Sequence, residues 1–260
     1  MNCQKLREKL RTYKRVAVAL SGGLDSSALL AVCADMLGVQ NCLALTAKGA
    51  HMMRAEIDDA KNLCENLGVK FLSIDCEIPS ILRNNPPDRC YICKREIFTK
   101  FKDEAFKLGF EILVDGTNFD DLSDYRPGMK ALKELGVISP FLDCEIGKDE
   151  IREIAQNYNL KVAKKPAYAC LLTRFEHGAN VSKEDLQRVD GAEEFLRGLS
   201  FNSVRVRVHS YVARIEIPRE KFADFLMRSE EISKHLKVFG FSHVALDING
   251  YMRGSMNENG

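Results

Sequence analysis

The string SGGLDSS, residues 21–27, carries the first group of residues whose types and spacing could do chemistry. It follows the apolar run Val16–Leu20 and opens a helical pattern. Glycines let the backbone approach a ligand closely, and the amide groups of a helix N-terminus attract anions. Ser21, Ser26 and Ser27 add hydroxyl groups. The string therefore predicts a phosphate-binding loop.

This loop differs from the P-loop of kinases. It lacks the pattern G-x-x-x-x-G-K-[ST] and has no lysine to reach terminal phosphates, which argues against ordinary phosphoryl transfer. Asp25 is placed to contact Mg²⁺ bound with a nucleotide. The alternative is a plain strand-to-helix turn with a serine cap, which a bare Gly-Gly pair would favour.

Cysteines form the second group. Cys90 and Cys93 have the spacing that lets two thiolates reach one metal, in a loop that we expect to open a helix. Cys170 is the natural third ligand, and three thiolates would suit an iron–sulfur cluster with one open iron. A structural zinc completed by His177 and a thioredoxin-like redox pair are the alternatives. The remaining cysteines in element interiors are expected to be small core residues: Cys33, Cys42, Cys64 and Cys76.

Strand and helix patterns alternate through the first part of the chain, which predicts an α/β fold with a parallel sheet wrapped by helices. Such sheets bind ligands at the carboxyl ends of their strands. The segments expected there are residues 21–27, Thr46–Gly49, the Pro-rich loop ending at Cys90, and Asp115–Gly128. The predicted strands are 16–20, 42–46, 70–74 and 111–116, and the predicted helices are 27–37, 54–67, 94–108 and 148–158.

A segment of mixed polarity after residue 158 breaks this periodicity, and we place a domain boundary in it. The prediction is a nucleotide-binding domain over residues 1–168 and a smaller α+β domain over 169–260. A helix is expected over 183–199, followed by alternating strands at 203–209 and 212–218. Arg205 and Arg207 share one side of the first strand, and Arg214 and Glu216 share one side of the second, so the two strands predict a basic surface if their register aligns these residues. The alternative is a solvated strand face.

The composition of the chain excludes a strong overall electrostatic field. The 38 basic and 37 acidic side chains give a formal net charge of +1, so neither nucleic acid nor an anionic membrane is an expected partner. The apolar run near the N-terminus is far shorter than the roughly 20 residues of a membrane span, and we expect no signal peptide. Nine cysteines spread through a mid-sized chain suggest a reducing, cytoplasmic location.

The loop resembles the SGGxDS signature of the ATP-pyrophosphatase (PP-loop) superfamily, whose fold is adenine nucleotide alpha hydrolase-like. Nearly the whole chain resembles the LarE family of sulfur transferases, through SGGLDSS, RCYICK, DGTNFDDLSDYRPGMKAL, KPAYACLLTRFEHG and VRVRVH followed by ARIEIP. The resemblance implies that ATP is cleaved between its α and β phosphates. It also implies that carboxyl groups of pyridinium-3,5-biscarboxylic acid mononucleotide become thiocarboxylates, a step in making the nickel-pincer nucleotide cofactor.

The resemblance also implies roles for particular residues. Cys170 handles sulfur, and Cys90, Cys93 and Cys170 hold a four-iron four-sulfur cluster whose unique iron carries the transferable sulfide. In family members without the cysteine pair, the residue matching Cys170 gives up its own sulfur. Together, the loop, the strand ends and the family pattern predict these ATP contacts: Ser21, Gly22, Gly23, Asp25, Ser26, Ser27, Thr46, Gly116 and Arg126. The predicted substrate contacts are Glu193, Arg205, Arg207 and Asp224.

Arg126 is our candidate for offsetting charge on the departing pyrophosphate, and the family implies a homohexamer. The sulfide donor stays open. Three other functions compete with sulfur transfer to a small nucleotide. A tRNA thiolase of the superfamily would bind nucleic acid, whereas an ammonia-dependent synthetase or a non-enzymatic nucleotide-sensing module would leave Cys90, Cys93 and Cys170 without a role.

Overall fold

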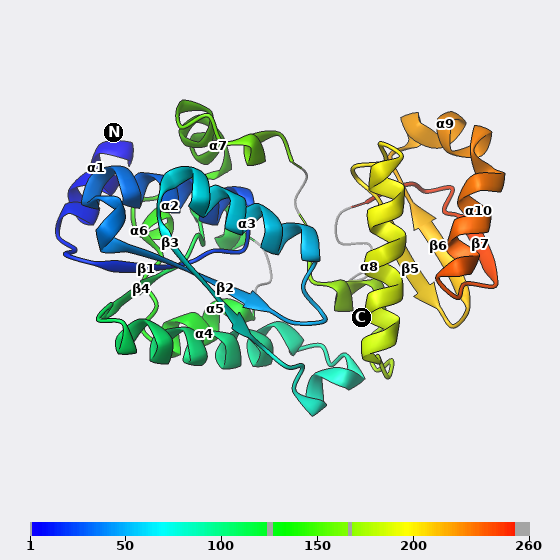
Figure 1. Ribbon diagram of the computed structural model, residues 1–260, viewed down its shortest axis with the longest axis horizontal. Helices are drawn as coiled ribbons and strands as arrows, with labels where there is room; N and C mark the ends of the chain where they lie inside the picture. The colour runs from blue at the N-terminus through cyan, green and yellow to red at the C-terminus, as the bar shows by residue number, and fades with distance from the viewer. Residues whose placement is uncertain (1, 124–126, 166–167, 253–260) are drawn as a thin grey trace. The chain divides into compact units, whose positions relative to one another are not determined.

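The chain consists of two compact units in the computed structural model, which describes residues 2–123, 127–165 and 168–252 (Figure 1). The first unit comprises Met1–Ile78 and Pro87–Tyr168, and the second comprises Pro79–Pro86 and Ala169–Gly260. Each unit contains its own sheet. The second unit is therefore built from two separate stretches of sequence.

The first unit contains a four-stranded sheet in the order β3-β2-β1-β4. Every neighbouring pair is parallel, with Ala17 of β1 opposite Leu43 on one side and Leu113 on the other. The prediction of a parallel sheet wrapped by helices is confirmed. The strands are β1 (Val16–Ala19), β2 (Cys42–Lys48), β3 (Lys70–Asp75) and β4 (Ile112–Val114).

Helices cover both faces of this sheet (Figure 1). Val16 and Val18 face one core cluster, formed with α1, α2, α3, α6 and α7, whereas Ala17 and Ala19 face a second, formed with α4 and α5. Successive side chains of β1 point to opposite faces of the sheet, so this short, fully buried strand contributes to both core clusters. The helices are α1 (Asn2–Arg11), α2 (Leu24–Leu37), α3 (Arg54–Leu67), α4 (Arg89–Lys107), α5 (Gly128–Glu134), α6 (Pro140–Asp143) and α7 (Lys148–Asn157).

Helix α4 begins five residues earlier than the predicted start at Lys94. Asp88 is its N-cap and follows two prolines, Pro86 and Pro87, which cannot continue a helix from the preceding segment. Cys90 and Cys93 therefore lie on the first turns of the helix. The prediction that they occupy a loop before it is wrong.

The second unit is an α+β arrangement around a three-stranded sheet in the order β5-β6-β7. Strands β5 and β6 form an antiparallel hairpin, and β6 and β7 are parallel. Ser182 caps α8 through the backbone amide of Asp185, whose side chain bonds back to Ser182. The elements are α8 (Lys183–Gly198), β5 (Arg205–His209), β6 (Val212–Glu216), α9 (Phe222–Met227), α10 (Ser229–Val238) and β7 (His243–Leu246).

The segment Pro79–Pro86 joins the second unit through hydrogen bonds. The amide of Val181 donates to the carbonyl of Arg83 at 2.7 Å. Asn85 is fully buried, and its Nδ2 lies 2.9–3.1 Å from three backbone carbonyl oxygens, those of Leu172, Phe175 and Glu176. One side chain thus ties this segment to the stretch that follows Cys170.

Replacing Asn85 with alanine should lower the free energy of unfolding by about 2–4 kcal/mol, because buried carbonyl groups lose their donor and alanine is strained at positive φ. Asn85 has a φ of 43°. Asn159→Ala is the control, since Asn159 has a φ of 53° but is exposed. Urea unfolding of both variants checks the prediction, and equal losses would show that backbone strain alone accounts for the effect.

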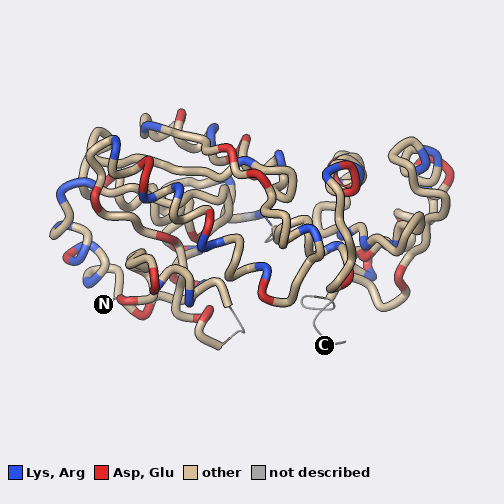
Figure 2. Tube along the Cα trace, turned by 90° about the horizontal axis from the view of Figure 1, so that it is seen from below, with Lys and Arg blue, Asp and Glu red and all other residues tan. Residues whose placement is uncertain are grey.

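Basic and acidic residues are interspersed along the chain in both units (Figure 2). None of the described helices combines the length and the apolar character that crossing a membrane requires.

Candidate active site

The predicted phosphate loop connects β1 to α2. Gly22 has a φ of +78°, and a Cβ there would lie 2.2 Å from the carbonyl oxygen of Glu56 on α3. Only glycine fits such a position. Gly23 is the N-cap of α2 and Ser21 is exposed, so the loop presents backbone amides at a helix N-terminus. This arrangement is suited to binding an anion.

The side chain of Ser26 stabilises the loop through contacts with other loop residues. Its buried hydroxyl accepts from the amide of Ser21 at 3.1 Å and lies 3.3 Å from the carbonyl oxygen of Gly23. The Ser21 hydroxyl lies 3.1 Å from that of Ser26 and accepts from the amide of Gly23 at 3.3 Å. Ser27 is buried, and its amide bonds to Gly23. These contacts fix the loop's shape.

Two further predicted residues pack against this loop. A Cβ on Gly116, just beyond β4, would lie 2.7 Å from the amide nitrogen of Ser26, so the two backbones are in close contact. Thr46 is buried at the end of β2, and its hydroxyl donates to the carbonyl of Leu20 at 2.7 Å. The strand ends therefore meet at the loop, as the parallel topology predicts. Arg126 lies outside the described residues.

Lys148, the first residue of α7, was not predicted. Its ammonium forms an ion pair with the Asp25 carboxylate, and both side chains are partly exposed. The backbone amide of Lys148 donates to Asp120 at 2.7 Å, which anchors the start of α7. No local sequence pattern singles out this lysine, because its partner Asp25 lies 123 positions away. The pair places a cation beside the phosphate loop.

The loop after β4 is held by hydrogen bonds among polar side chains, one of which, Ser139, comes from the segment before α6. Asp115 accepts from the hydroxyls of Thr117 at 2.5 Å and Ser139 at 2.6 Å. Asn118 is fully buried, and its amide donates to Asp121 at 3.2 Å. This network fixes the backbone that carries Gly116.

Cys90 and Cys93 lie in the first unit and Cys170 lies in the second. Cys90 is exposed, and Cys93 is partly buried against the core cluster that includes α4. Cys170 is the N-cap of a short 3₁₀ helix, Leu171–Arg174. Within either unit, the described residues contain no group of three or more His, Cys, Asp or Glu side chains placed to hold a metal. By donor chemistry, accessible or partly accessible thiols suit iron–sulfur ligation.

The cysteines predicted to be core residues are buried, which confirms that prediction: Cys33, Cys42, Cys64 and Cys76. Burial raises the pKa of the Cys64 thiol to about 12 and that of Cys42 to about 11. Such thiols are poor nucleophiles and poor metal ligands at neutral pH.

His51 is a neighbour of Cys93 that sequence reasoning missed. It follows β2 and is 1% exposed, and its Nε2 lies 3.3 Å from the Cys93 sulfur. Burial lowers the pKa of His51 to about 4, so the imidazole is neutral at physiological pH. A lone histidine after a strand carries no functional signal, and only the fold brings it to the cysteine pair.

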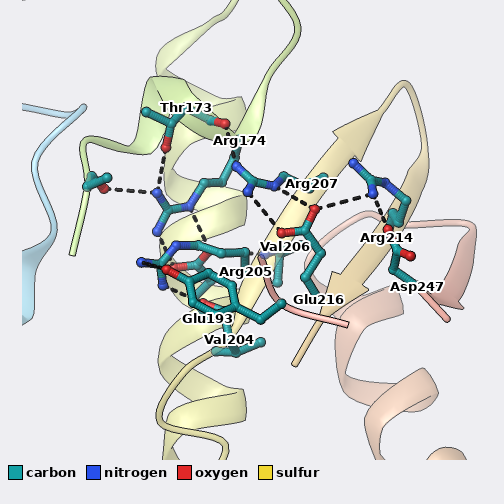
Figure 3. Close-up of polar contacts among 12 residues, drawn as sticks. Thr173, Arg174, Glu193, Val204, Arg205, Val206, Arg207, Arg214, Glu216 and Asp247 are labelled. Atoms are coloured by element: carbon teal, nitrogen blue, oxygen red, sulfur yellow. Dashed lines mark hydrogen bonds and ion pairs between the residues drawn. The ribbon is translucent and has the colours of Figure 1, made fainter. Parts of the chain in front are cut away.

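In the second unit, a network of arginines and glutamates lies between α8 and the hairpin of β5 and β6 (Figure 3). Arg174 and Glu193 are both fully buried and form a two-pronged ion pair, with distances of 2.8 and 2.9 Å. Arg207 and Glu216 form a second such pair at 3.0 and 2.9 Å. Arg214 also contacts Glu216, at 3.2 Å. The network is therefore built from paired charges.

The predicted basic surface on β5 is wrong. Arg205 and Arg207 are 4% and 5% exposed, which also excludes a solvated strand face. The register places Arg207 opposite Arg214, as a basic face requires, but Glu216 lies on the same face and forms ion pairs with both. Alternation in the sequence shows which residues share a side, and it does not show whether that side is covered.

Charges in the network shift one another's pKa values. Burial would raise the pKa of Glu193, but the charge of Arg174 and its hydrogen bonds outweigh burial and lower it. Burial and the neighbouring charge of Arg174 lower the pKa of Arg205. The guanidinium of Arg205 also lies over the ring of Tyr251, 5.1 Å from its centroid. An anion beside Arg205 would relieve this crowding of positive charge.

Asp224, the last of the predicted substrate contacts, is exposed on α9. It forms an ion pair with Lys221 at 3.1 Å. Its environment differs from that of Glu193, which is fully buried.

Comparisons with known proteins bear on both units. The family model described as NAD synthase matches residues 2–88, which include the phosphate loop. An uncharacterized protein of Synechocystis sp. is 38% identical over 98% of this chain and 96% of its own length. A pyridinium-3,5-bisthiocarboxylic acid mononucleotide synthase of Lactiplantibacillus plantarum is 35% identical over 96% of this chain and 91% of its own. A tRNA-specific 2-thiouridylase of Syntrophus aciditrophicus is 28% identical over 59% of this chain and 50% of its own.

Proposed function

Because this chain belongs to the LarE family, with the pyridinium-3,5-bisthiocarboxylic acid mononucleotide synthase as a relative along nearly its whole length, we propose that it is an ATP-dependent sulfur transferase acting on the corresponding carboxylated nucleotide. The similarity to the tRNA thiolase covers only 59% of this chain, which makes that alternative the weaker one. The observation that carries the proposal is the phosphate loop. Gly22 and Gly116 leave no room for side chains and bring backbone amides together at the start of α2.

We propose that ATP, entering with Mg²⁺, binds along this loop, with Asp25 beside the metal ion. A carboxylate oxygen of the substrate then attacks the α phosphorus. The new P–O bond forms as the bond to the β-phosphate oxygen breaks, which leaves an acyl adenylate and releases pyrophosphate. Lys148 is suited to offset the charge that develops on the departing pyrophosphate, because its ammonium lies beside the loop. Arg126 is proposed for the same task.

The second half-reaction exchanges an oxygen for sulfur. The acyl carbon gains a C–S bond and loses its bond to the adenylate oxygen, so that AMP leaves. A four-iron four-sulfur cluster held by Cys90, Cys93 and Cys170 would supply the sulfur when bound, and the thiol donors fit this chemistry. His51 would orient the sulfur of Cys93 through the contact of its Nε2 with that sulfur.

We propose that the second unit recognises the substrate. Arg205 and Arg207 are proposed to bind the phosphate of the substrate nucleotide, and the lowered pKa of Arg205 supports this role because a neighbouring anion would stabilise its charge. Asp224 is proposed as an acidic position of the same pocket in a homohexamer, and Glu193, which is fully buried, as an acidic residue that shapes this pocket from behind without touching the substrate. Residues 1–168 would then activate ATP, and residues 169–260 would hold the substrate and Cys170.

Lys148→Gln should lower kcat/KM for substrate-dependent pyrophosphate release by about 100-fold, the scale expected for losing one group that stabilises a transition-state charge. The matched control is Lys165→Gln, which removes a lysine from a similar ion pair with Asp59. Thermal unfolding of both variants should match that of the unaltered chain, because the pairs are partly exposed. A pyrophosphate assay that showed equal effects for the two variants would contradict the role given to Lys148.

A further inference from the structure

We propose that Arg174 and Glu193 form a positioning pair that fixes the backbone around Cys170; this inference rests on the proposed function, in which Cys170 takes part in sulfur transfer. Arg174 donates hydrogen bonds to the cysteine segment on one side and to Glu193 of α8 on the other. The pair therefore connects the segment Ala169–Thr173 to the core of the second unit (Figure 3).

The contacts of Arg174 divide between two tasks. Its Nε and one terminal nitrogen bind both oxygens of Glu193, at 2.8 and 2.9 Å. The other terminal nitrogen donates to the carbonyl of Ala169 at 2.9 Å and the hydroxyl of Thr173 at 2.7 Å, and lies 3.4 Å from the carbonyl oxygen of Cys170. A planar guanidinium can do both at once, whereas an ammonium cannot.

Thr173 completes the arrangement. Its hydroxyl donates to the Cys170 carbonyl at 2.7 Å while it accepts from Arg174. Its own carbonyl accepts from Arg207 at 2.7 Å. Arg174 and Thr173 thus hold the backbone around Cys170 by hydrogen bonds, while Cys170 itself stays partly exposed. This combination gives a fixed sulfur that a reactant can approach.

Glu193 is held in turn. It is fully buried, accepts from the amide of Val206 on β5 at 3.0 Å, and lies 3.4 Å from Arg197 one helical turn away. Burying two charges is costly unless their geometry is well matched. The Glu193 carboxylate is fixed because Glu193 lies on α8 and accepts a hydrogen bond from β5. Arg174, which binds both oxygens of this carboxylate, is therefore held in one orientation. Glu193 acts on Cys170 through Arg174, without needing to touch the substrate.

The test uses Arg174→Lys, which keeps a positive charge opposite Glu193 but loses the second set of hydrogen bonds. Arg214→Lys is the matched control, because Arg214 belongs to the same network through Glu216 and Asp247. Hydrogen–deuterium exchange of the peptide containing residues 169–175 should become at least about tenfold faster in Arg174→Lys alone. Thiocarboxylate formation should fall by about tenfold or more, while pyrophosphate release is unchanged.

Two results would overturn the proposal. In one, exchange at residues 169–175 is unchanged in Arg174→Lys; in the other, pyrophosphate release and thiocarboxylate formation fall together, which would indicate general damage to the fold. If the unaltered chain releases no pyrophosphate with the proposed substrate, the proposed function fails, but the exchange measurement still decides whether Arg174 holds the Cys170 segment. The two failures are therefore distinguishable.

Glu193→Gln separates positioning from substrate contact. If Glu193 acts through Arg174, this variant lowers kcat for thiocarboxylate formation and leaves KM for the nucleotide substrate unchanged. If Glu193 instead contacts the substrate, KM rises and exchange at residues 169–175 stays slow, and the proposed positioning role for Glu193 is overturned.

Discussion

Replacing Cys170 with alanine is expected to lower thiocarboxylate formation by about 1,000-fold or more, because sulfur transfer loses a group on which the chemistry depends. Pyrophosphate release from ATP should change little, since the phosphate loop lies in the first unit and Cys170 lies in the second. Anaerobic assays that follow pyrophosphate and thiocarboxylate separately, with the carboxylated nucleotide as substrate, measure both half-reactions.

Cys3→Ala is the control for the loss of an accessible thiol, because Cys3 is exposed on α1. Iron content after reconstitution gives a second readout: about four irons per chain, lost in Cys90→Ala, Cys93→Ala and Cys170→Ala, would support a three-thiolate cluster. Retained sulfur transfer in Cys170→Ala would refute the proposed role. A mass loss at Cys170 after one turnover would indicate that the residue gives up its own sulfur.

Gly22→Ala is expected to lower pyrophosphate release by about 100-fold or more, the cost expected when a reacting group is misplaced by about 1 Å. The added methyl group would lie 2.2 Å from the Glu56 carbonyl oxygen, so either the loop or α3 must move. Because that oxygen belongs to the backbone, no side-chain rotation can relieve the overlap. The amides at the start of α2 would then no longer converge on one anion.

Gly68→Ala is a close control for backbone strain. Gly68 has a φ of +72°, similar to that of Gly22, but a Cβ there meets nothing within 4 Å. This variant should lose about 1–2 kcal/mol of stability and keep full activity below its unfolding temperature. If both variants keep the same activity, the close contact of Gly22 with α3 has no role in binding ATP.

The sheet of the first unit and four of its helices could be predicted because the sequence signals of these elements are local, whereas α1, α5 and α6 were not predicted. The helix pattern that stops at Gly68 became α3, and Gly68 is its left-handed C-cap. The apolar run at Val16 became the buried strand β1. Parallel topology then required the strand ends to converge, which is why Thr46 and Gly116 lie at the loop.

Parts of the site depend on contacts between distant residues, and these could not be predicted. Lys148 and Asp25 are separated by 123 positions, and no local pattern joins them. His51 and Cys93 are separated by 42. The arginines of β5 were assigned correctly to one side of a strand, but the pairing of Arg207 depends on Glu216 of another strand. Periodicity describes one element and contains no information about what covers it.

The buried hydrogen bonds of Asn85 limit where the chain can be divided or recombined with a relative. The chain passes between the units at residues 78–79, 86–87 and 168–169, so the second unit is discontinuous. During synthesis Asn85 leaves the ribosome 87 residues before Leu172, whose carbonyl oxygen it contacts. A fragment that begins at Ala169 lacks this buried donor. An exchange of C-terminal halves between relatives preserves the contact only if Pro79–Pro86 is transferred with them.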